Sequence, residues 1–545
     1  MSASCHFAEY TMKLTQTYLQ PLSAKGPFHY DAQSRHENIL FLSLDMVPRE
    51  FYGVIDTPVP MRTPTLDALK QQHIFFSSAY CTSPLCSPSR ASFLSGRYSY
   101  ITVNAERAHD GQAVHVRQDD SLFPEYLKSI GYHTRHVGKS HIGTHKFMDM
   151  FSENDSPWDR WSPPWNDDEG YIAFLRQKGF GRMSFERCMY GQDASSRGPG
   201  NFYGGWIAPQ NGRAFPKEAS YPAYLVDKAI QTLETRQNPE QPFYLQLDFF
   251  GPHQPFAIPA GMEEREREIR ETLELPETYL ALMENNFNPP WEEARVYRLY
   301  RKNWGMNDPD LMKDYMTANI LQFELLDELI GKFFDYLKEN DLYNDSWIYL
   351  IADHGEMNGE LALIDKGAYL NPASIRVPLY LKPPAQHEYG SLQREVTTPV
   401  SLLDLAPTIF QSVGITNPER LDGVSLFKAI DGQERPKDTP LLCEIWSHAV
   451  PNPAVGMIFR AADGCEYMFS FNACDDLDEL YRVDNCKTLR NLYHDESTAD
   501  IVQEALLRME AALDADARWN CYSGYFKLTY ADRLGKPIGD RQKFF

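Results

Sequence analysis

Short apolar runs alternate with helical patterns through most of the chain, and several of these runs end in polar residues. ENILFLSLD ends in Asp45, and SWIYLIADHGE passes from apolar positions to Asp353 and His354. Continuous apolar runs of this length predict strands that are buried on both faces of a parallel sheet. Because the same alternation recurs at 121–143 and 241–253, we expect a doubly wound α/β core with ligands at the carboxyl edge of its sheet.

The pattern divides the chain into unequal parts. A polar lead-in at 1–35 precedes the main α/β domain, which we expect at 36–400. Within it, 151–215 is rich in Trp, Pro, Gly and Asp and shows no clear periodicity, which predicts a loop-rich insertion. We expect a smaller subdomain at 401–515. The aromatic tail at 516–545 either packs on a neighbouring subunit or folds back on its own core.

The composition of the chain indicates which kinds of binding partner and which cellular compartment to expect. The 545 residues carry a formal net charge of −22 and no basic run, which excludes nucleic acid as the expected partner. The nine cysteines have no disulfide-framework or metal-knuckle spacing, which is typical of a reducing compartment. The chain shows neither a signal-peptide pattern at its start nor an apolar run of about 18 residues. We therefore expect a cytoplasmic protein that does not enter a membrane.

The segment CSPSRASFLSGR at 86–97 carries the most specific chemical signal in the chain. It resembles the signature of the type I, formylglycine-dependent sulfatases of the alkaline phosphatase superfamily. In that family Cys-x-Pro-Ser-Arg is followed by Leu-Thr-Gly-Arg, and only Ser95 differs here, in place of Thr. The matching residues are Cys86, Pro88, Ser89, Arg90, Leu94, Gly96 and Arg97.

The resemblance implies that a maturation enzyme converts Cys86 to formylglycine. One hydroxyl of the hydrated aldehyde would be the nucleophile, and the second would allow sulfate to be expelled as the aldehyde re-forms. Arg90 follows Cys86 at i+4, so both project to the same side if Cys86 opens a helix. The resemblance assigns Arg90 the task of holding formylglycine and Lys139 in place.

Three further strings match the family at chemically important positions. GYHTRHVGKSHIG gives Lys139 as a clamp on sulfate oxygens and His141 as the group that deprotonates the residual hydroxyl. FFGPHQPF gives His253, which in the family donates a hydrogen bond or proton to the substrate. IADHGEMNGELALIDKGAYL gives Lys366 as a second cation on the leaving-group side.

The resemblance also implies one divalent metal ion, held by Asp45, Asp353, His354 and an oxygen of the modified Cys86. Oxygen ligands favour calcium, or alternatively magnesium, whereas an imidazole ligand shifts some weight to manganese or zinc. Met46 departs from the family pattern, because the family has Asp, Asn or Gln there and a thioether is a poor ligand for a hard cation. The identity and affinity of the metal are therefore open.

His354 and the string DHGEMNGE are similar to the branch of choline sulfatases and phosphonate monoester hydrolases. This resemblance implies a homo-oligomer. The strings GMIFRAADGCEYMFSF and DELYRVDNCKTLRNLY resemble the small C-terminal antiparallel sheet of the sulfatase family, and the acidic charge favours a small sulfate ester as substrate over a long polyanion. A phosphonate monoester or phosphodiester hydrolase built on the same residues is the alternative. A metal-impaired homologue that only binds ligands is a third interpretation, which Met46 alone supports.

Overall fold

A computed structural model describes most of the chain. The described residues are 28–31, 37–55, 57, 59–99, 116, 121–154, 163, 165–191, 201–416, 421–435, 440–475, 477–484, 489–531 and 534. The lead-in up to 27 and the last residues, 535–545, therefore lie outside the described part. None of the described helices combines the length and the apolarity that crossing a membrane requires.

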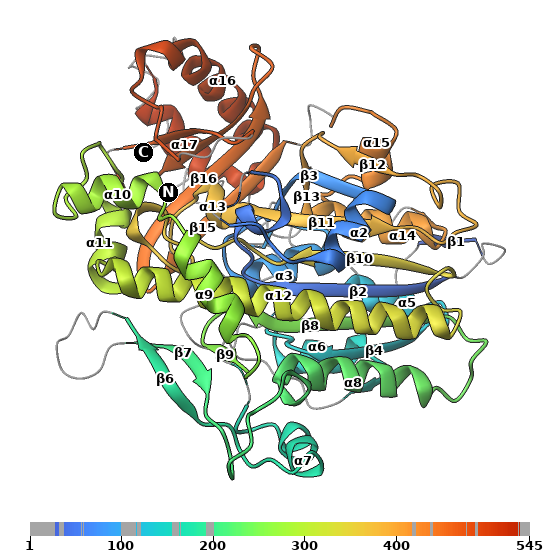
Figure 1. The fold of residues 1–545 in the computed structure, drawn as a ribbon. Coiled ribbons are helices and arrows are strands. Elements are labelled where there is room, and N and C mark those ends of the chain that lie inside the picture. The colour runs from blue at the N-terminus through green and yellow to red at the C-terminus, as the bar shows by residue number, and fades with distance from the viewer. Residues whose placement is uncertain are drawn as a thin grey trace, which may run out of the picture.

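A nine-stranded mixed sheet forms the centre of the molecule (Figure 1). The strands run parallel to one another except β11, which is antiparallel to both of its neighbours. The order along the sheet is β12 (Arg394–Val396), β3 (Ile74–Tyr80), β11 (Arg376–Lys382), β10 (Ser346–Ala352), β2 (Asn38–Asp45), β8 (Phe243–Pro252), β4 (His133–Gly138) and β5 (Glu153–Asn154), with β13 (Val400–Ser401) also paired to β3.

Helices cover both faces of this sheet. One layer comprises α2 (Pro64–Gln72), α8 (Tyr221–Glu234), α9 (Glu263–Thr272) and α12 (Pro309–Glu339), with α12 packed on the other three. The opposite layer comprises α3 (Cys86–Ser95), α5 (Phe123–Ser129), α6 (Thr144–Met150), α14 (Leu405–Ser412) and α15 (Leu426–Ile430). Figure 1 shows α12 running across the front of the sheet. The two layers explain why β2, β8 and β10 are almost wholly buried, as their apolar runs predicted.

Shorter elements connect the layers and strands. They are β1 (His29–Tyr30), η1 (Arg49–Tyr52), η3 (Lys217–Ala219), α10 (Glu277–Glu284), α11 (Arg295–Trp304), η4 (Glu360–Ala362), α13 (Pro372–Ile375), η5 (Leu402–Asp404) and β14 (Ile415–Thr416). These connections leave the carboxyl edge of the central strands surrounded by loops, which is where the sequence placed its candidate residues.

The segment 151–215 is more regular than its sequence predicted. It contains α7 (Glu169–Gln177), β6 (Phe185–Tyr190) and β7 (Phe202–Ile207), and β7 also pairs with β9 (Phe256–Ile258). Gly204 and Gly205 interrupt the apolar pattern of β7, yet the sheet requires them. A Cβ at Gly204 would lie 2.1 Å from the Phe256 oxygen, and one at Gly205 would lie 2.3 Å from the Arg187 oxygen.

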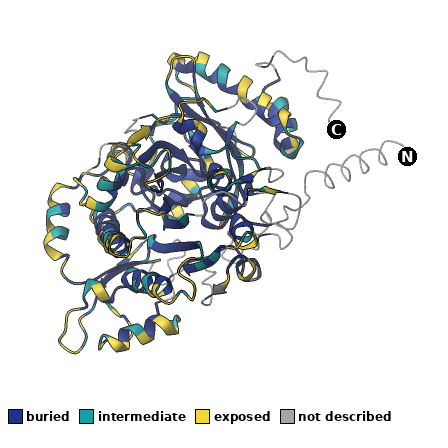
Figure 2. Cartoon of the chain, turned by 90° about the vertical axis from the view of Figure 1, so that its right-hand side faces the viewer, coloured by how far each residue is buried: buried dark blue, intermediate teal, exposed yellow. Residues whose placement is uncertain are grey.

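The C-terminal part has the expected antiparallel sheet with its own apolar core. The sheet consists of β15 (Leu441–His448), β16 (Val450–Arg460), β17 (Glu466–Asn472) and β18 (Glu479–Arg482). It is covered by α16 (Ala499–Ala515) and α17 (Asn520–Thr529), which η6 (Glu496–Thr498) and η7 (Ala517–Trp519) precede. In Figure 2 each of these helices has a buried and an exposed face.

The start of the aromatic tail folds back on its own subunit. Trp519, Tyr522, Phe526 and Tyr530 belong to the apolar cluster between the C-terminal helices and sheet. Of the two arrangements that the sequence left open, the described part of the tail therefore adopts the internal one. Tyr525 faces outward and is 50% exposed.

Candidate active site

The carboxyl ends of four adjacent parallel strands bring the predicted residues together. Asp45 is the last residue of β2, and Asp353 follows β10 directly. Lys139 follows β4, and His253 follows β8. Since these strands are neighbours in the order β10, β2, β8 and β4, residues more than 300 positions apart meet at one edge.

Helix α3 delivers Cys86 to this edge as its first residue, as the i+4 argument required. Pro88 is compatible with the first turn, where a backbone N–H has no helical partner. The Ser89 hydroxyl donates to the Asp353 carbonyl oxygen at 2.5 Å and fastens the helix to the end of β10. The helix ends at Gly96, whose φ of 68° is left-handed and suits glycine.

Four side chains form a compact, fully buried cluster of potential metal ligands. One ligand atom each from Asp45, Cys86, Asp353 and His354 lies within 4.8 Å of the others. The Cys86 Sγ is 3.1 Å from His354 Nε2 and 3.7 Å from Asp45 Oδ1. His354 Nδ1 lies 2.9 Å from the carbonyl oxygen of Gly355, which directs Nε2 toward the cluster. Two carboxylates and an oriented imidazole fit a divalent cation.

Arg90 ties the acidic residues of the cluster together. Its Nε donates to Asp353 Oδ2 at 2.9 Å, and Nη2 lies 3.7 Å from Asp45 Oδ2. Its Nη1 donates to the Lys139 carbonyl oxygen at 3.2 Å. The guanidinium thus links three strand ends, and its bond to Lys139 agrees with the expectation that it holds Lys139 in place.

Lys139 gives the Cys86 side of the cluster a positive environment. Its Nζ donates to Asp45 Oδ2 and lies 3.6 Å from Cys86 Sγ. Burial raises the pKa of the Cys86 thiol, but Lys139, Lys366 and His354 outweigh burial and bring that pKa well below its usual value. The same lysine, with His253 and Arg90, lowers the pKa of Asp45 against the opposing effects of burial and Cys86. The site therefore favours negative charge at residue 86.

His141 is held as a neutral imidazole next to Cys86. Burial, partly opposed by a hydrogen bond with Cys86, lowers the pKa of His141 to about 4. The residue has a φ of 52°, so the backbone after β4 turns sharply to present it. A neutral imidazole can accept a proton, which matches the role that the sequence assigned.

Lys366 and His253 face each other beside the cluster. Lys366 Nζ lies 2.6 Å from His253 Nε2 and 3.0 Å from Asp365 Oδ1. Both residues are buried, with exposed fractions of 2% and 3%. All of the predicted residues (Asp45, Cys86, Arg90, Lys139, His141, His253, Asp353, His354 and Lys366) thus meet at one buried edge.

Met46 takes part in the site through its backbone. It is fully buried with a φ of 63°, and its N–H donates to Asp353 Oδ1 at 3.2 Å. Its sulfur lies 3.8 Å from Lys366 Nζ. The side chain therefore contacts Lys366 and offers only a thioether, which is a poor ligand for a hard cation.

Three polar residues near the site were missed by the sequence analysis. Asp248 of β8 lies 2.9 Å from His136 Nε2 and 3.6 Å from Arg90 Nη1. An acid inside the apolar string FYLQLDFF was an available signal. Asp365 contacts Lys366 and lies inside the string that gave Lys366, but the sequence analysis assigned it no role. His448 comes from the C-terminal sheet and belongs to none of the matched strings.

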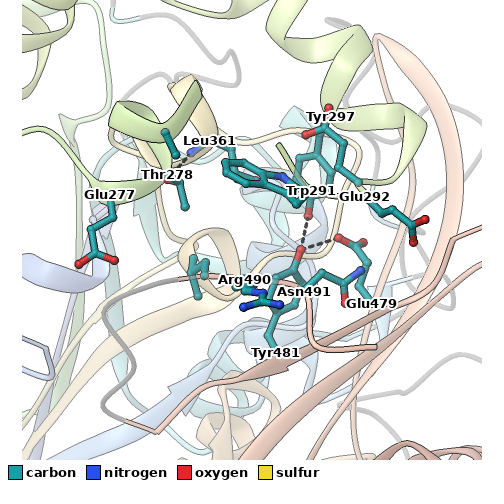
Figure 3. A pocket seen from close by; sticks show the side chains of 13 residues that line it. Glu277, Thr278, Trp291, Glu292, Tyr297, Leu361, Glu479, Tyr481, Arg490 and Asn491 are labelled. Carbon is teal, nitrogen blue, oxygen red and sulfur yellow. Dashed lines mark hydrogen bonds between the residues drawn. The ribbon is translucent and has the colours of Figure 1, made fainter. Parts of the chain in front are cut away.

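A separate cavity lies between α10, α11 and η4 on one side and β18 of the C-terminal sheet on the other. Its volume is ≈ 200 Å³, and Figure 3 shows aromatic rings on opposite sides of it. The hydroxyl of Tyr481 lies 3.4 Å from that of Tyr297 and donates to Glu479. The lining includes Trp291, Tyr297, Leu361, Glu479, Tyr481 and Arg490. None of the predicted site residues lines this cavity. The residues at the buried edge of the sheet therefore identify the candidate active site better than the presence of a cavity does.

Comparisons with known proteins agree with this geometry. A family model described as Sulfatase matches residues 37–415, and one described as N-sulphoglucosamine sulphohydrolase, C-terminal, matches residues 359–514. The Uncharacterized sulfatase YidJ of Escherichia coli (strain K12) is 26% identical over 402 residues, which are 72% of this chain and 71% of that protein. The Choline-sulfatase of Rhizobium meliloti (strain 1021) is 26% identical over 432 residues, 77% of this chain and 76% of that protein.

A solved structure shows the same fold. The phosphonate monoester hydrolase SpPMH from Silicibacter pomeroyi has a TM-score of 0.65 and 20% identity, over 88% of this chain and 96% of that chain. The Sulfatase model spans more than half of the chain and contains the whole buried edge described above. The chain belongs to the sulfatase family, in the alkaline phosphatase superfamily.

Proposed function

We propose that this protein is a sulfuric ester hydrolase that cleaves a small sulfate monoester at residue 86. The observation that carries the proposal is the position of Cys86 within the cluster of potential metal ligands, 3.6 Å from Lys139 Nζ and within the electrostatic reach of Lys366. A sulfate ester is anionic and tetrahedral, so its cleavage requires cations on its oxygens, a nucleophile and a proton for the leaving oxygen. This edge of the sheet offers residues of each kind.

The nucleophile that we propose is formylglycine formed from Cys86 by a maturation enzyme. In that conversion Cβ receives one oxygen atom from an external oxidant and becomes an aldehyde, while the sulfur leaves as sulfide. The hydrated aldehyde supplies one hydroxyl to attack sulfur and another whose deprotonation releases sulfate. Neutral His141 beside residue 86 is suited to accept that proton.

Asp45, Asp353, His354 and an oxygen on residue 86 would hold the divalent metal ion, for which calcium is our first candidate, with magnesium and manganese as alternatives. Such an ion would lower the pKa of the hydroxyl on residue 86 and neutralise charge on the sulfate group. Arg90 orients Asp353 and the end of β4.

Lys139 and Lys366 are suited to bind sulfate oxygens from opposite sides. Lys139 approaches from the end of β4, and Lys366 approaches from the loop after β10, where it contacts His253. The Lys366–His253 pair is the proposed source of the proton for the leaving oxygen. In this proposal Lys139 acts near the nucleophile, and Lys366 acts near the leaving group.

A phosphonate monoester or phosphodiester hydrolase is the second candidate. One similar protein, 25% identical over 69% of this chain and 73% of its own length, is named Multifunctional alkaline phosphatase superfamily protein PehA, from Trinickia caryophylli. The same cations would serve the transition states of sulfur and phosphorus esters. The metal-impaired, ligand-binding homologue is a weaker third candidate, because Met46 alone supports it and the four potential metal ligands lie together at the buried edge.

We also propose a cellular location and an oligomeric state, and both rest on the composition of the chain and on its resemblance to the family. A cytoplasmic homo-oligomer remains our proposal, although Trp519 to Tyr530, which suggested a subunit contact, pack internally. Light scattering on the purified full chain at several concentrations tests the oligomer, and a constant monomer mass would overturn it.

The test of function is hydrolysis of matched substrates by the metal-loaded protein. We expect sulfate release from a 4-nitrophenyl sulfate to exceed hydrolysis of the matched phosphodiester and phenylphosphonate. Cys86→Ala should lower sulfate release by about 10⁴-fold or more, because it removes the nucleophile. Cys188→Ala, at an exposed cysteine, is the control and should leave the rate unchanged. Preference for the diester would favour the second candidate, and equal rates for Cys86→Ala and the unaltered chain would overturn both.

A further inference from the structure

Lys366 and His253 belong to different loops, yet their nitrogens must meet precisely. The two residues are 113 positions apart, and His253 follows β8 whereas Lys366 lies in the connection between β10 and β11. Neither side chain projects from a helix or strand. Something must therefore hold the two loops together on the leaving-group side of residue 86.

The Asp365 carboxylate contacts both loops. One oxygen, Oδ1, accepts from the Lys366 backbone N–H at 2.7 Å and lies 3.0 Å from Lys366 Nζ. The other, Oδ2, accepts from Gln254 Nε2 at 2.8 Å. Gln254 is the neighbour of His253, and its backbone oxygen contacts His253 Nδ1. A single carboxylate thus joins the lysine loop to the histidine loop.

The surroundings of this carboxylate fix its own position. Asp365 has a φ of 66°, a left-handed conformation that Asp and Asn tolerate better than most residues. Its backbone N–H donates to Glu356 Oε1, which also accepts from the Asn358 N–H at 3.0 Å. The Tyr315 hydroxyl donates to Gln254 Oε1 at 3.3 Å. The loop is therefore anchored on both sides of the Asp365 contacts.

The hydrogen-bond pattern also determines where the protons lie. An ammonium group only donates, so Lys366 donates to His253 Nε2, and His253 must carry its proton on Nδ1, which donates to the Gln254 oxygen. Burial lowers the pKa of Lys366, but Asp365 is foremost among the groups that outweigh it and keep that ammonium charged. The arrangement stores the transferable proton on Lys366 and orients His253 as its neutral partner.

We propose that Asp365 is the positioning residue of the leaving-group side: it holds Lys366 directly and His253 through Gln254. It acts through these groups and does not contact the substrate. The proposal rests on the proposed function and assigns a role to a residue outside the signature motifs. A carboxylate that only stabilised the loop would affect all substrates alike, whereas a positioning residue should matter most when the leaving oxygen most needs a proton.

The test compares Asp365→Asn with the unaltered chain on aryl sulfates whose phenols differ in pKa. Asn removes the charge but suits the left-handed backbone. We expect kcat to fall by roughly 100-fold for the poorest leaving group, the scale of a misplaced catalytic group. For the best leaving group we expect almost no change. Asp341→Asn is the matched control, because Asp341 is exposed and has a φ of 58°. Equal losses across the series, or no loss, would overturn the proposal.

A second measurement separates this proposal from the proposed function. Nitrogen-15 NMR of histidine-labelled protein reports which ring nitrogen of His253 carries the proton, with His253→Gln used to assign the signal. We expect the Nδ1–H form in the unaltered chain and a shift toward a mixture of tautomers in Asp365→Asn. An unchanged signal in Asp365→Asn would overturn the positioning role even if the chain hydrolysed no sulfate ester. Absence of sulfate release with the expected NMR change would instead contradict only the proposed function.

Discussion

The two sides of residue 86 are built in different ways. On the side that we propose holds the metal, Asp45 ends β2, Asp353 directly follows β10, and Arg90 donates a hydrogen bond to Asp353. On the side that we propose faces the leaving group, His253 directly follows β8, but Lys366 stands in the connection between β10 and β11, and side-chain contacts hold the two together. The metal side is therefore fixed mainly by strand ends, whereas the position of Lys366 on the leaving-group side depends on a few hydrogen bonds. We infer that the leaving-group side can change in sequence without a change in the fold.

Among the changes that compare the two sides, metal removal should have the largest effect, because it removes the positive charge that would neutralise the sulfate group. Chelation followed by desalting should lower sulfate release by roughly 10³-fold, since metal stabilisation of charge is worth several kcal/mol. The unfolding temperature should also fall, because a ligand bound only by the folded state stabilises it. Calorimetry and an activity assay after re-addition of calcium, magnesium or manganese measure both effects. Full activity in metal-free protein would contradict the assignment of Asp45, Asp353 and His354.

The two lysines should respond differently to the leaving group. Lys139→Ala should lower kcat/KM by roughly 10²- to 10³-fold for all aryl sulfates, the scale for loss of one oxyanion-stabilising group. Lys366→Ala should cost more as the phenol becomes less acidic, because Lys366 contacts His253 on the leaving-group side. A leaving-group series for both variants, with unfolding temperatures as the control for folding, measures the contrast. The same dependence for both lysines would remove the distinction between the sides.

Substitution of Met46 should have the smallest effect, and this effect should be tighter binding of the metal ion. Met46→Asn should tighten metal binding by about 10-fold, because an amide oxygen adds a hard ligand beside Asp353. The left-handed backbone at Met46, with a φ of 63°, is one that Asn tolerates. Isothermal titration with calcium compares this variant with Met46→Leu, which keeps an apolar side chain and should leave affinity unchanged. Equal affinity for the two variants would show that Met46 does not limit the metal site.

The residues that we propose as metal ligands could be singled out from the sequence because their signals are local. Apolar runs that end in Asp45 and Asp353 mark buried parallel strands, and the edge of such a sheet gathers their ends. The signature around Cys86 predicted both the start of α3 and the placement of Arg90. Fold class, antiparallel C-terminal sheet and sulfatase family were likewise predicted and are confirmed.

The remaining features depend on contacts that no local pattern records. Asp365 links loops 111 positions apart in the chain, and its left-handed backbone leaves no mark in hydrophobic periodicity. Strand β7 was missed because Gly204 and Gly205 serve close backbone approach instead of side-chain packing. The internal packing of Trp519 and its neighbours could not be predicted from the sequence, because it depends on the apolar core between the C-terminal helices and sheet.

The most direct test of the central claim is mass spectrometry of the peptide that spans Cys86, isolated from the native host and treated with an aldehyde-reactive tag. The account predicts formylglycine at residue 86 and tagging that disappears in Cys86→Ala. Unmodified cysteine in protein that still hydrolyses sulfate esters would contradict the proposed mechanism. Unmodified cysteine in inactive protein would contradict the proposed function and favour the ligand-binding alternative.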